Sequence, residues 1–281
     1  MTTFVKLGVF SGSFIVFGTF MNFATAQPVE APCIPKHHFS TLVPGTLKVA
    51  YTPFWPTIDV KNGKLIGFEG QLLNEFAKME CLKTEVEKVT ASEIIPAVQA
   101  KRDDVGTGGW FRSKRRMEIV AMSYPTMISE LALMSKAGFK TFAEAKGHTV
   151  GTIKGNLWVP ESQAYYGDDF KIYQTNDQLY ADLRAGRLDA CIVDYALAKQ
   201  VVNDQTVPGA TFVVPKGIPQ ISSSMKPAQV AFPTIISNKE FTAAMDDDIK
   251  LMHASGFVTK ALESVKLSPA LEKTGAPDFL D

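Results

Sequence analysis

The sequence predicts an α/β protein built from two similar lobes, each a mostly parallel sheet flanked by helices. Three observations predict this fold class: strand-like and helix-like segments alternate, the alternation occurs twice, and two short segments have similar sequences. These segments are QAKRDDV at 99–105 and RAGRLDA at 184–190. We therefore expect each half of the chain to form its own sheet.

The first half contains three predicted strands separated by two predicted helices. Residue patterns predict strands at 47–51, 84–89 and 104–107. Apolar residues at positions 72, 73, 76 and 77 share one helical face and predict a helix over 69–79; a second helix follows at 94–100. Asn62-Gly63 is a typical hairpin turn.

The second half repeats this order. It contains predicted strands at 149–153, 170–173 and 188–193, and predicted helices at 160–165, which has a proline in its first turn, and at 177–185. The segment 239–264 is predicted to be helical, with an interruption at Ser255-Gly256.

The N-terminus resembles an export signal. Lys6 precedes an apolar run over 7–23 that ends at Ala24-Thr25-Ala26, so we predict a signal peptide over 1–26, cleaved after Ala26, and a periplasmic location. A membrane anchor is the alternative, since about twenty apolar residues could span a bilayer. Residues 27–44 contain four prolines and are predicted to form an extended lead-in.

Composition and motifs exclude several classes of protein. Apolar residues at 46%, charged residues at 21% and a net charge of zero describe an ordinary globular protein and do not favour nucleic acid as a partner. The four histidines, at 37, 38, 148 and 253, lack metal-ligand spacing, and neither a G-x-S-x-G motif nor a phosphate loop occurs. We therefore expect no catalytic set, metal or cofactor.

The chain has three cysteines, which an oxidising compartment allows to form one disulfide. Cys191 lies in an apolar predicted strand and is expected to be a buried free thiol. Cys33 precedes the first strand and Cys81 follows the first helix. We predict that these two are bonded, within the geometric limits of a disulfide.

All three tryptophans, Trp55, Trp110 and Trp158, lie just after predicted strand ends, where open α/β sheets bind ligands. Any one of them could instead be a core residue. Large aromatic side chains bury much area and stack on flat or cationic groups. Their shared position favours an aromatic-lined ligand site.

Charged and glycine-rich positions offer candidate polar contacts. One arginine of the basic run 112–116 could hold a carboxylate, but spacing alone does not decide which, and such runs are usually solvated. Gly155-Asn156 separates a strand from a helix and could offer backbone N–H groups to an anion, or only turn the chain. Asp194 follows the last strand and could meet an ammonium group or cap a helix.

These segments together resemble the periplasmic polar amino-acid binding proteins, family 3 of bacterial solute receptors. Matching segments follow the family's order over residues 45–266: GTLKVA at 45–50, GKLIGFEG at 63–70, IPAVQ at 95–99, the block 104–125, VGTIKG at 150–155, AGRLDA at 185–190, and Gly256. The resemblance implies the two-lobed, type II periplasmic-binding-protein fold. It also implies boundaries at 45–131 for the first part of lobe 1, 132–226 for lobe 2 and 227–281 for the return to lobe 1.

The resemblance also assigns roles to single residues. Ser113 to Arg116 matches the family's T-x-x-R, which makes Arg116 the carboxylate-binding residue, with Arg115 as the alternative. Asp194 matches the acid that faces the ammonium group. The remaining candidates are Gly108, Gly109 and Phe111 in a first-lobe loop, Asn156 and Leu157 in the second lobe, and the aromatic residues Tyr51, Phe54, Trp55, Trp110 and Trp158.

Several candidates depart from the family pattern. Tyr51 stands where many members have a second ammonium-binding Asp, and Phe111 and Leu157 replace a frequent Ser and Thr. Trp158 replaces another polar residue. The site keeps one anion contact and one cation contact while its other walls become aromatic, which predicts a zwitterion with an apolar, flat or alkylated-ammonium portion.

The resemblance implies a monomeric substrate-binding component of an ABC importer, which closes on its ligand about a hinge and delivers it to a membrane permease. Because fold does not fix function, two alternatives stay open. One is a periplasmic dehydratase acting on cyclohexadienyl or arogenate-type substrates, for which Glu161 is the acid nearest Trp158. The other is an accessory protein that binds a partner enzyme or sensor.

Overall fold

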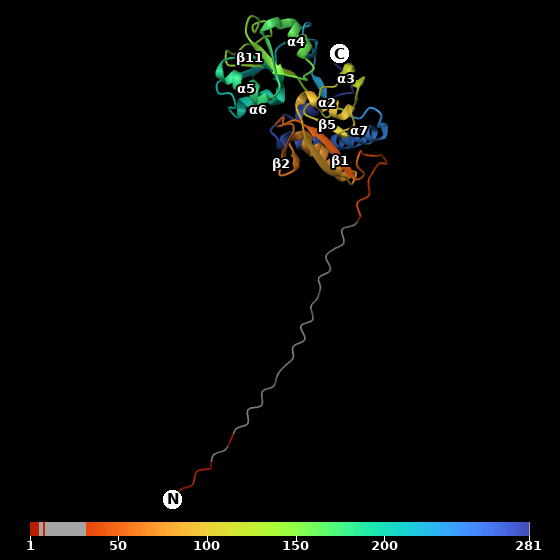
Figure 1. Cartoon of the computed structure of the whole chain (residues 1–281), viewed down its shortest axis with the longest axis vertical. Coiled ribbons are helices and arrows are strands. Elements are labelled where there is room, and N and C mark those ends of the chain that lie inside the picture. Colours follow the sequence, from red (N-terminus) through yellow and green to blue (C-terminus); the bar gives the residue numbers. More distant parts are fainter. Residues whose placement is uncertain (6–7, 9–31, 281) are drawn as a thin grey trace. The chain divides into compact units, whose positions relative to one another are not determined.

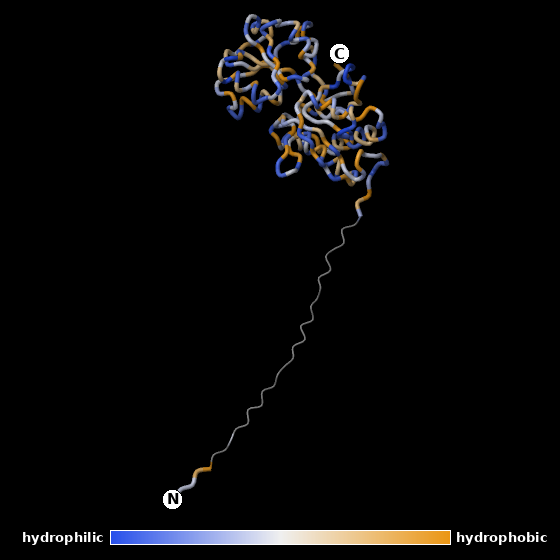
Figure 2. The backbone as a smooth tube through the Cα atoms, in the orientation of Figure 1, coloured by the Kyte–Doolittle hydropathy of each residue, from blue (hydrophilic) through white to orange (hydrophobic). Residues whose placement is uncertain are grey.

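A computed structural model describes residues 1–5, 8 and 32–280. The predicted cleavage site after Ala26 and most of the predicted signal peptide lie outside these residues. Residues 34–281 form one compact unit. Along the described part of this unit, apolar and polar segments are interspersed (Figure 2). None of the helices that the structure describes has the length and apolar character needed to span a bilayer.

Two five-stranded sheets form the framework of the compact unit (Figure 1). The first sheet has the order β4-β1-β5-β14-β6, with β1 at Thr46–Tyr51, β4 at Lys83–Lys88, β5 at Val105–Thr107, β6 at Ala121–Met122 and β14 at Pro233–Thr234. The second has the order β10-β9-β11-β8-β12, with β8 at Leu131–Ser135, β9 at Val150–Ile153, β10 at Phe170–Tyr173, β11 at Ala190–Asp194 and β12 at Thr211–Val213.

The two sheets share one topology. In the first, β4, β1 and β5 are parallel and β14 is antiparallel to both of its neighbours. In the second, β10, β9 and β11 are parallel and β8 is antiparallel to both of its neighbours. The prediction of two similar, mostly parallel sheets is therefore confirmed.

Eight α-helices lie in the described residues, and Figure 1 shows α4, α5 and α6 grouped with β11 of the second sheet, whereas α2, α3 and α7 group with β1 and β5 of the first. Their bounds are α1 Phe68–Met79, α2 Ala91–Gln99, α3 Lys114–Met117, α4 Val159–Tyr166, α5 Asn176–Ala185, α6 Tyr195–Asn203, α7 Lys239–Ala254 and α8 Phe257–Ser264.

Local sequence explains where several of these elements begin and end. Helix α2 begins three residues before the predicted start because Thr90 and Glu93 form a capping box. The predicted interruption at 255–256 is confirmed: Gly256 adopts φ 72° between α7 and α8. Asn62-Gly63 forms the predicted hairpin turn, here between β2 (Asp59–Lys61) and β3 (Lys64–Ile66).

The chain passes between the two sheets twice. It leaves the first sheet through β7 (Met127–Ser129) and returns from the second through β13 (Ala228–Val230), and these two strands pair antiparallel to each other. The strand β14 then joins the first sheet beside β5. The boundaries between lobes at 131–132 and 226–227 stay a prediction.

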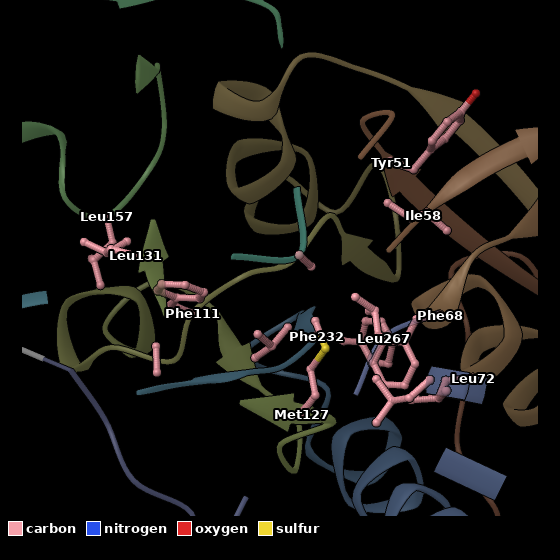
Figure 3. Packing of buried hydrophobic residues seen from close by; sticks show 14 of the residues in the cluster. Tyr51, Ile58, Phe68, Leu72, Phe111, Met127, Leu131, Leu157, Phe232 and Leu267 are labelled. Carbon is pink, nitrogen blue, oxygen red and sulfur yellow. The ribbon is translucent and has the colours of Figure 1, made fainter. Parts of the chain in front are cut away.

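The largest buried apolar cluster draws side chains from both sheets. Figure 3 shows part of it, with Phe111 near Leu131 and Leu157, and a second group that includes Phe68, Met127 and Phe232. The ring of Phe111 is 2% exposed. Residues on the loop after β5 are therefore packed against segments that belong to the second sheet.

The cysteines follow the prediction. Cys33 and Cys81 are disulfide-bonded. Cys191 is a free thiol, fully buried in β11.

Candidate functional site

The described residues enclose a cavity of about 430 Å³ at the carboxyl ends of the parallel strands. This is the edge at which open α/β sheets bind ligands, and the size is typical of a small-molecule site. Loops that follow β1, β4 and β5 form one wall, and loops that follow β9, β10 and β11 form the other. The cavity therefore lies where the two sheets face each other.

Ten of the twelve predicted site residues line this cavity: Phe54, Gly108, Gly109, Trp110, Phe111, Arg116, Asn156, Leu157, Trp158 and Asp194. Tyr51 and Trp55 do not line it. Tyr51 ends β1 and joins the buried apolar cluster, and Trp55 is 39% exposed at the surface. Their positions lend no support to contact with a ligand.

Arg116 is the buried cation of the cavity wall. The residue is 8% exposed. Its guanidinium donates from Nη1 to the carbonyl of Phe111 at 2.6 Å and from Nη2 to the carbonyl of Gly155 at 3.2 Å, and it stacks on the ring of Trp110 at 4.5 Å. Within residues 32–280 no acidic side chain forms an ion pair with it. Burial lowers the pKa of Arg116 to about 9, because the charge has lost most of its water.

The other arginines of the basic run have different positions. Arg115 is exposed and lies outside the cavity lining. Arg112 is buried, but it donates to the carbonyls of Met122 and Ser123 and stacks on Phe279. Arg116 is therefore the arginine of this run whose charge faces the cavity.

Asp194 provides the buried anion. It ends β11 and is 3% exposed; its Oδ2 accepts from the hydroxyl of Ser129 at 2.5 Å and its Oδ1 accepts from the N–H of Ala196 at 2.8 Å. It therefore caps α6 as well as lining the cavity. Burial raises the pKa of Asp194 to about 6, since removing water disfavours the carboxylate.

Aromatic side chains from both walls meet in the cavity. Phe111 of the first wall and Trp158 of the second have ring centroids 5.7 Å apart. The indole N–H of Trp158 and the side-chain amide of Asn156 both donate to the hydroxyl of Thr152, at 2.9 and 3.2 Å. Asn156 therefore uses its amide to orient the loop, while the described hydrogen bonds leave the backbone N–H groups of Leu157 and Trp158 without acceptors.

Glu69 is a site residue that the sequence reasoning missed. It is fully buried and accepts hydrogen bonds from the hydroxyl of Thr107 at 2.5 Å and from the N–H groups of Gly108 and Gly109, at 2.8 and 3.2 Å. The signal was its place in the first turn of α1, where a carboxylate is favoured by the helix dipole. Its contacts hold the glycine loop against the cavity.

The conformation of this loop requires glycine. Gly108 and Gly109 have φ angles of 135° and 72°, which residues other than glycine rarely adopt. A Cβ atom on Gly109 would lie 2.9 Å from the ring of Phe54. The glycines therefore allow Phe54 to approach the loop that carries Trp110 and Phe111.

The cavity also extends to polar residues that the sequence analysis did not select. They lie at the end of β4 or after β4 and β10, and the lining residues among them are Lys88, Thr90, Glu93, Gln174, Thr175, Asn176 and Asp177. Their shared place at or after the end of a parallel strand was the only sequence signal. Polar residues are common in such loops, which is why this signal did not separate them from other loop residues.

Comparison with known proteins identifies the family. The model of the bacterial extracellular solute-binding proteins, family 3, matches residues 47–264. The histidine-binding periplasmic protein of Salmonella typhimurium is 25% identical over 171 residues, and the L-cystine-binding protein of Escherichia coli is 30% identical over 167 residues. Each match covers 56% of this chain and 64% and 62% of the relative, respectively, so the matched segment spans less than two thirds of these curated relatives.

Solved structures agree on the fold. An ancestral arginine-binding protein bound to arginine superposes with a TM-score of 0.70 at 26% identity, covering 79% of this chain and 98% of that one. The predicted type II periplasmic-binding-protein fold is confirmed. With the family model matching most of the compact unit, the chain belongs to the bacterial extracellular solute-binding proteins, family 3.

Proposed function

We propose that this protein is the periplasmic substrate-binding component of an ABC importer for an amino acid or a related zwitterion. The observation that carries the proposal is the buried guanidinium of Arg116, which lines the cavity without an acidic partner in residues 32–280. A buried charge is costly unless it is paired. A ligand carboxylate is the counter-charge that fits this position.

The two poles of the ligand meet opposite charges. The carboxylate pairs with Arg116 and accepts from the backbone N–H groups of Leu157 and Trp158. The ammonium group lies toward Asp194, whose raised pKa falls once a cation is next to it. The apolar part of the ligand packs on Phe111 and Trp158, which favours a flat or alkylated group.

Binding is coupled to closure of two lobes, which we assign to residues 45–131 with 227–281 and to residues 132–226. The paired strands β7 and β13, where the chain crosses between sheets, act as the hinge. Arg116 and Gly155 lie in the two lobes that we assign, and a hydrogen bond joins them. We expect this bond to break when the lobes open. A ligand that adds contacts to both lobes favours the closed state.

The names of the relatives agree with this class of ligand. Proteins similar to this chain are named as binding histidine, cystine or arginine, each of which carries a carboxylate and an ammonium group. Two charge-assisted contacts with aromatic stacking correspond to micromolar affinity, about −8 kcal/mol. The loaded protein then docks on a cognate permease as a monomer.

The dehydratase alternative has less support. Glu161, the acid named for it, accepts hydrogen bonds from Ser222 and Ser223 and does not line the cavity. The accessory-protein alternative does not account for a buried guanidinium that lines the cavity without an acidic partner in residues 32–280. The importer component therefore fits the geometry best.

A thermal-shift screen of the purified protein against amino acids, betaines and aromatic acids tests the proposal, because a ligand that binds the folded state raises the apparent Tm. The strongest shift is expected from a molecule that carries both a carboxylate and a cationic group. No shift with any compound, together with a co-purifying partner protein, would favour the accessory role. Turnover of an arogenate-type substrate would favour the dehydratase.

Gly155→Ala tests closure. Gly155 has a φ of 96°, and a Cβ atom there would lie 3.1 Å from the backbone of Ser92, at the start of α2 in the other wall. The substitution is expected to weaken ligand binding about tenfold, since it obstructs the contact between lobes, and isothermal titration calorimetry measures the loss.

The matched control is Gly186→Ala. Gly186 has a similar φ of 71°, but nothing lies within 4 Å of its added Cβ. Both variants are expected to lose about 1 kcal/mol of stability from backbone strain, whereas only Gly155→Ala loses affinity. Equal affinities in the two variants would exclude Gly155 as a closure contact.

A further inference from the structure

A second cluster of ligand-type side chains lies in the described residues, apart from the cavity. It consists of His37 in the N-terminal lead-in, Glu80 after α1 and Asp248 on α7. One ligand atom from each lies within 4.8 Å of the other two. Three segments that are distant in the sequence thus bring an imidazole and two carboxylates to one point.

The two acids are buried. Glu80 is 3% exposed and Asp248 is 1% exposed, although two neighbouring carboxylates repel each other away from water. Glu80 accepts from the Nδ1 of His37 at 2.7 Å and from its backbone N–H at 3.1 Å. Asp248, by contrast, has a buried Oδ2 that accepts from no N–H group in the described structure and faces the carboxyl group of Glu80. Two carboxyl groups that face each other away from water need a shared proton or a cation between them.

We propose that His37, Glu80 and Asp248 bind a divalent transition-metal ion such as Zn²⁺. Imidazole nitrogen with two carboxylate oxygens is a donor set that suits Zn²⁺, with water completing the coordination. The ion takes the place of the proton on Nδ1 of His37, and Oδ2 of Asp248 gains its partner. Binding joins the lead-in to α1 and α7.

The group that competes with such an ion is Lys36. Its ammonium lies 3.5 Å from the Oδ1 of Asp248 and 3.1 Å from the sulfur of Met79. The side chain of Lys36 is 40% exposed, so it can move into water when an ion binds. His37 is half-buried, which gives the ion a path from solvent.

Sequence spacing gave no sign of this site. We expected no metal because the histidines lack ligand spacing, and that test detects only ligands that are close in the sequence. His37, Glu80 and Asp248 meet only after the lead-in packs on α1 and α7.

Isothermal titration calorimetry with Zn²⁺ tests the proposal on protein that lacks a histidine tag and has been treated with a chelator. One ion per chain is expected. His37→Ala and the nearly isosteric Asp248→Asn are each expected to weaken binding by about 100-fold. Lys36→Ala is expected to strengthen it several-fold, because it removes the competing cation.

His38→Ala is the matched control, since His38 is exposed and adjacent to His37. It is expected to bind Zn²⁺ like the wild-type protein. The proposal is wrong if the wild-type protein binds no Zn²⁺, if His37→Ala and Asp248→Asn bind it as tightly, or if Ca²⁺ or Mg²⁺ binds more tightly than Zn²⁺. Thermal unfolding with chelator present shows whether each variant is folded.

Discussion

Arg116→Ala is expected to abolish the ligand-dependent thermal shift and to weaken binding by at least about 100-fold, which corresponds to about 2.7 kcal/mol. The substitution removes the guanidinium that we assign to the ligand carboxylate. It also removes the hydrogen bond to the carbonyl of Gly155 across the cavity. Titration calorimetry with the best ligand from the screen measures the loss.

Arg115→Ala is the control, because Arg115 is the exposed neighbour outside the cavity. It is expected to bind the ligand with unchanged affinity. Arg116→Lys is expected to restore little of the affinity for the ligand, since lysine cannot reproduce a planar, bidentate contact or the stacking on Trp110. An unaltered affinity in Arg116→Ala would mean that the carboxylate binds elsewhere.

Glu69→Gln is expected to flatten the pH dependence of stability. Burial raises the pKa of Glu69 to about 7 from its ordinary value of 4.5, against the opposing effect of its hydrogen bonds. The folded protein therefore binds more protons than the unfolded chain between these values. The contribution of Glu69 is fully present below pH 4.5 and is lost as the pH rises through about 7. It amounts to about 3 kcal/mol, and the amide of the variant cannot titrate.

Urea unfolding at pH 4.5 and at pH 7.5 measures this effect as the difference in the free energy of unfolding between wild type and variant. The difference cancels the contributions of buried acids that do not interact with Glu69, such as Asp103. Thr107→Val is a companion variant that removes a hydroxyl donor while keeping the carboxyl. That hydrogen bond lowers the pKa of Glu69, so Thr107→Val is expected to raise this pKa. The loss of stability with rising pH should then continue to a higher pH. An equal pH dependence in wild type and Glu69→Gln would show that Glu69 does not titrate in this range.

Among the described elements, the sequence predicted the parallel strands β1, β4, β5, β9, β10 and β11 and all α-helices except α3 and α6, and the misses have a physical cause. Strands with parallel neighbours, such as β1 and β9, were found because helices alternate with them. The strands β6 and β14 were missed because each has two residues, too few for a periodic pattern. The strand β8 was missed because it is antiparallel to both of its neighbours and no helix separates it from β7, so it lies outside the alternation of strands and helices.

By itself, the sequence determined the doubled α/β order and the positions after strand ends where most cavity residues lie, because these depend on local periodicity and on chain direction. It also indicated which two cysteines are bonded, because the third, Cys191, lies in an apolar strand. The tertiary structure decided which side chains face a shared space. It placed Arg116 in the cavity and Arg115 outside it, left out Tyr51 and Trp55, and brought Glu69 beneath the glycine loop. It also gathered His37, Glu80 and Asp248. The orientation of a side chain and its loss of water depend on packing between distant segments, which no local pattern records.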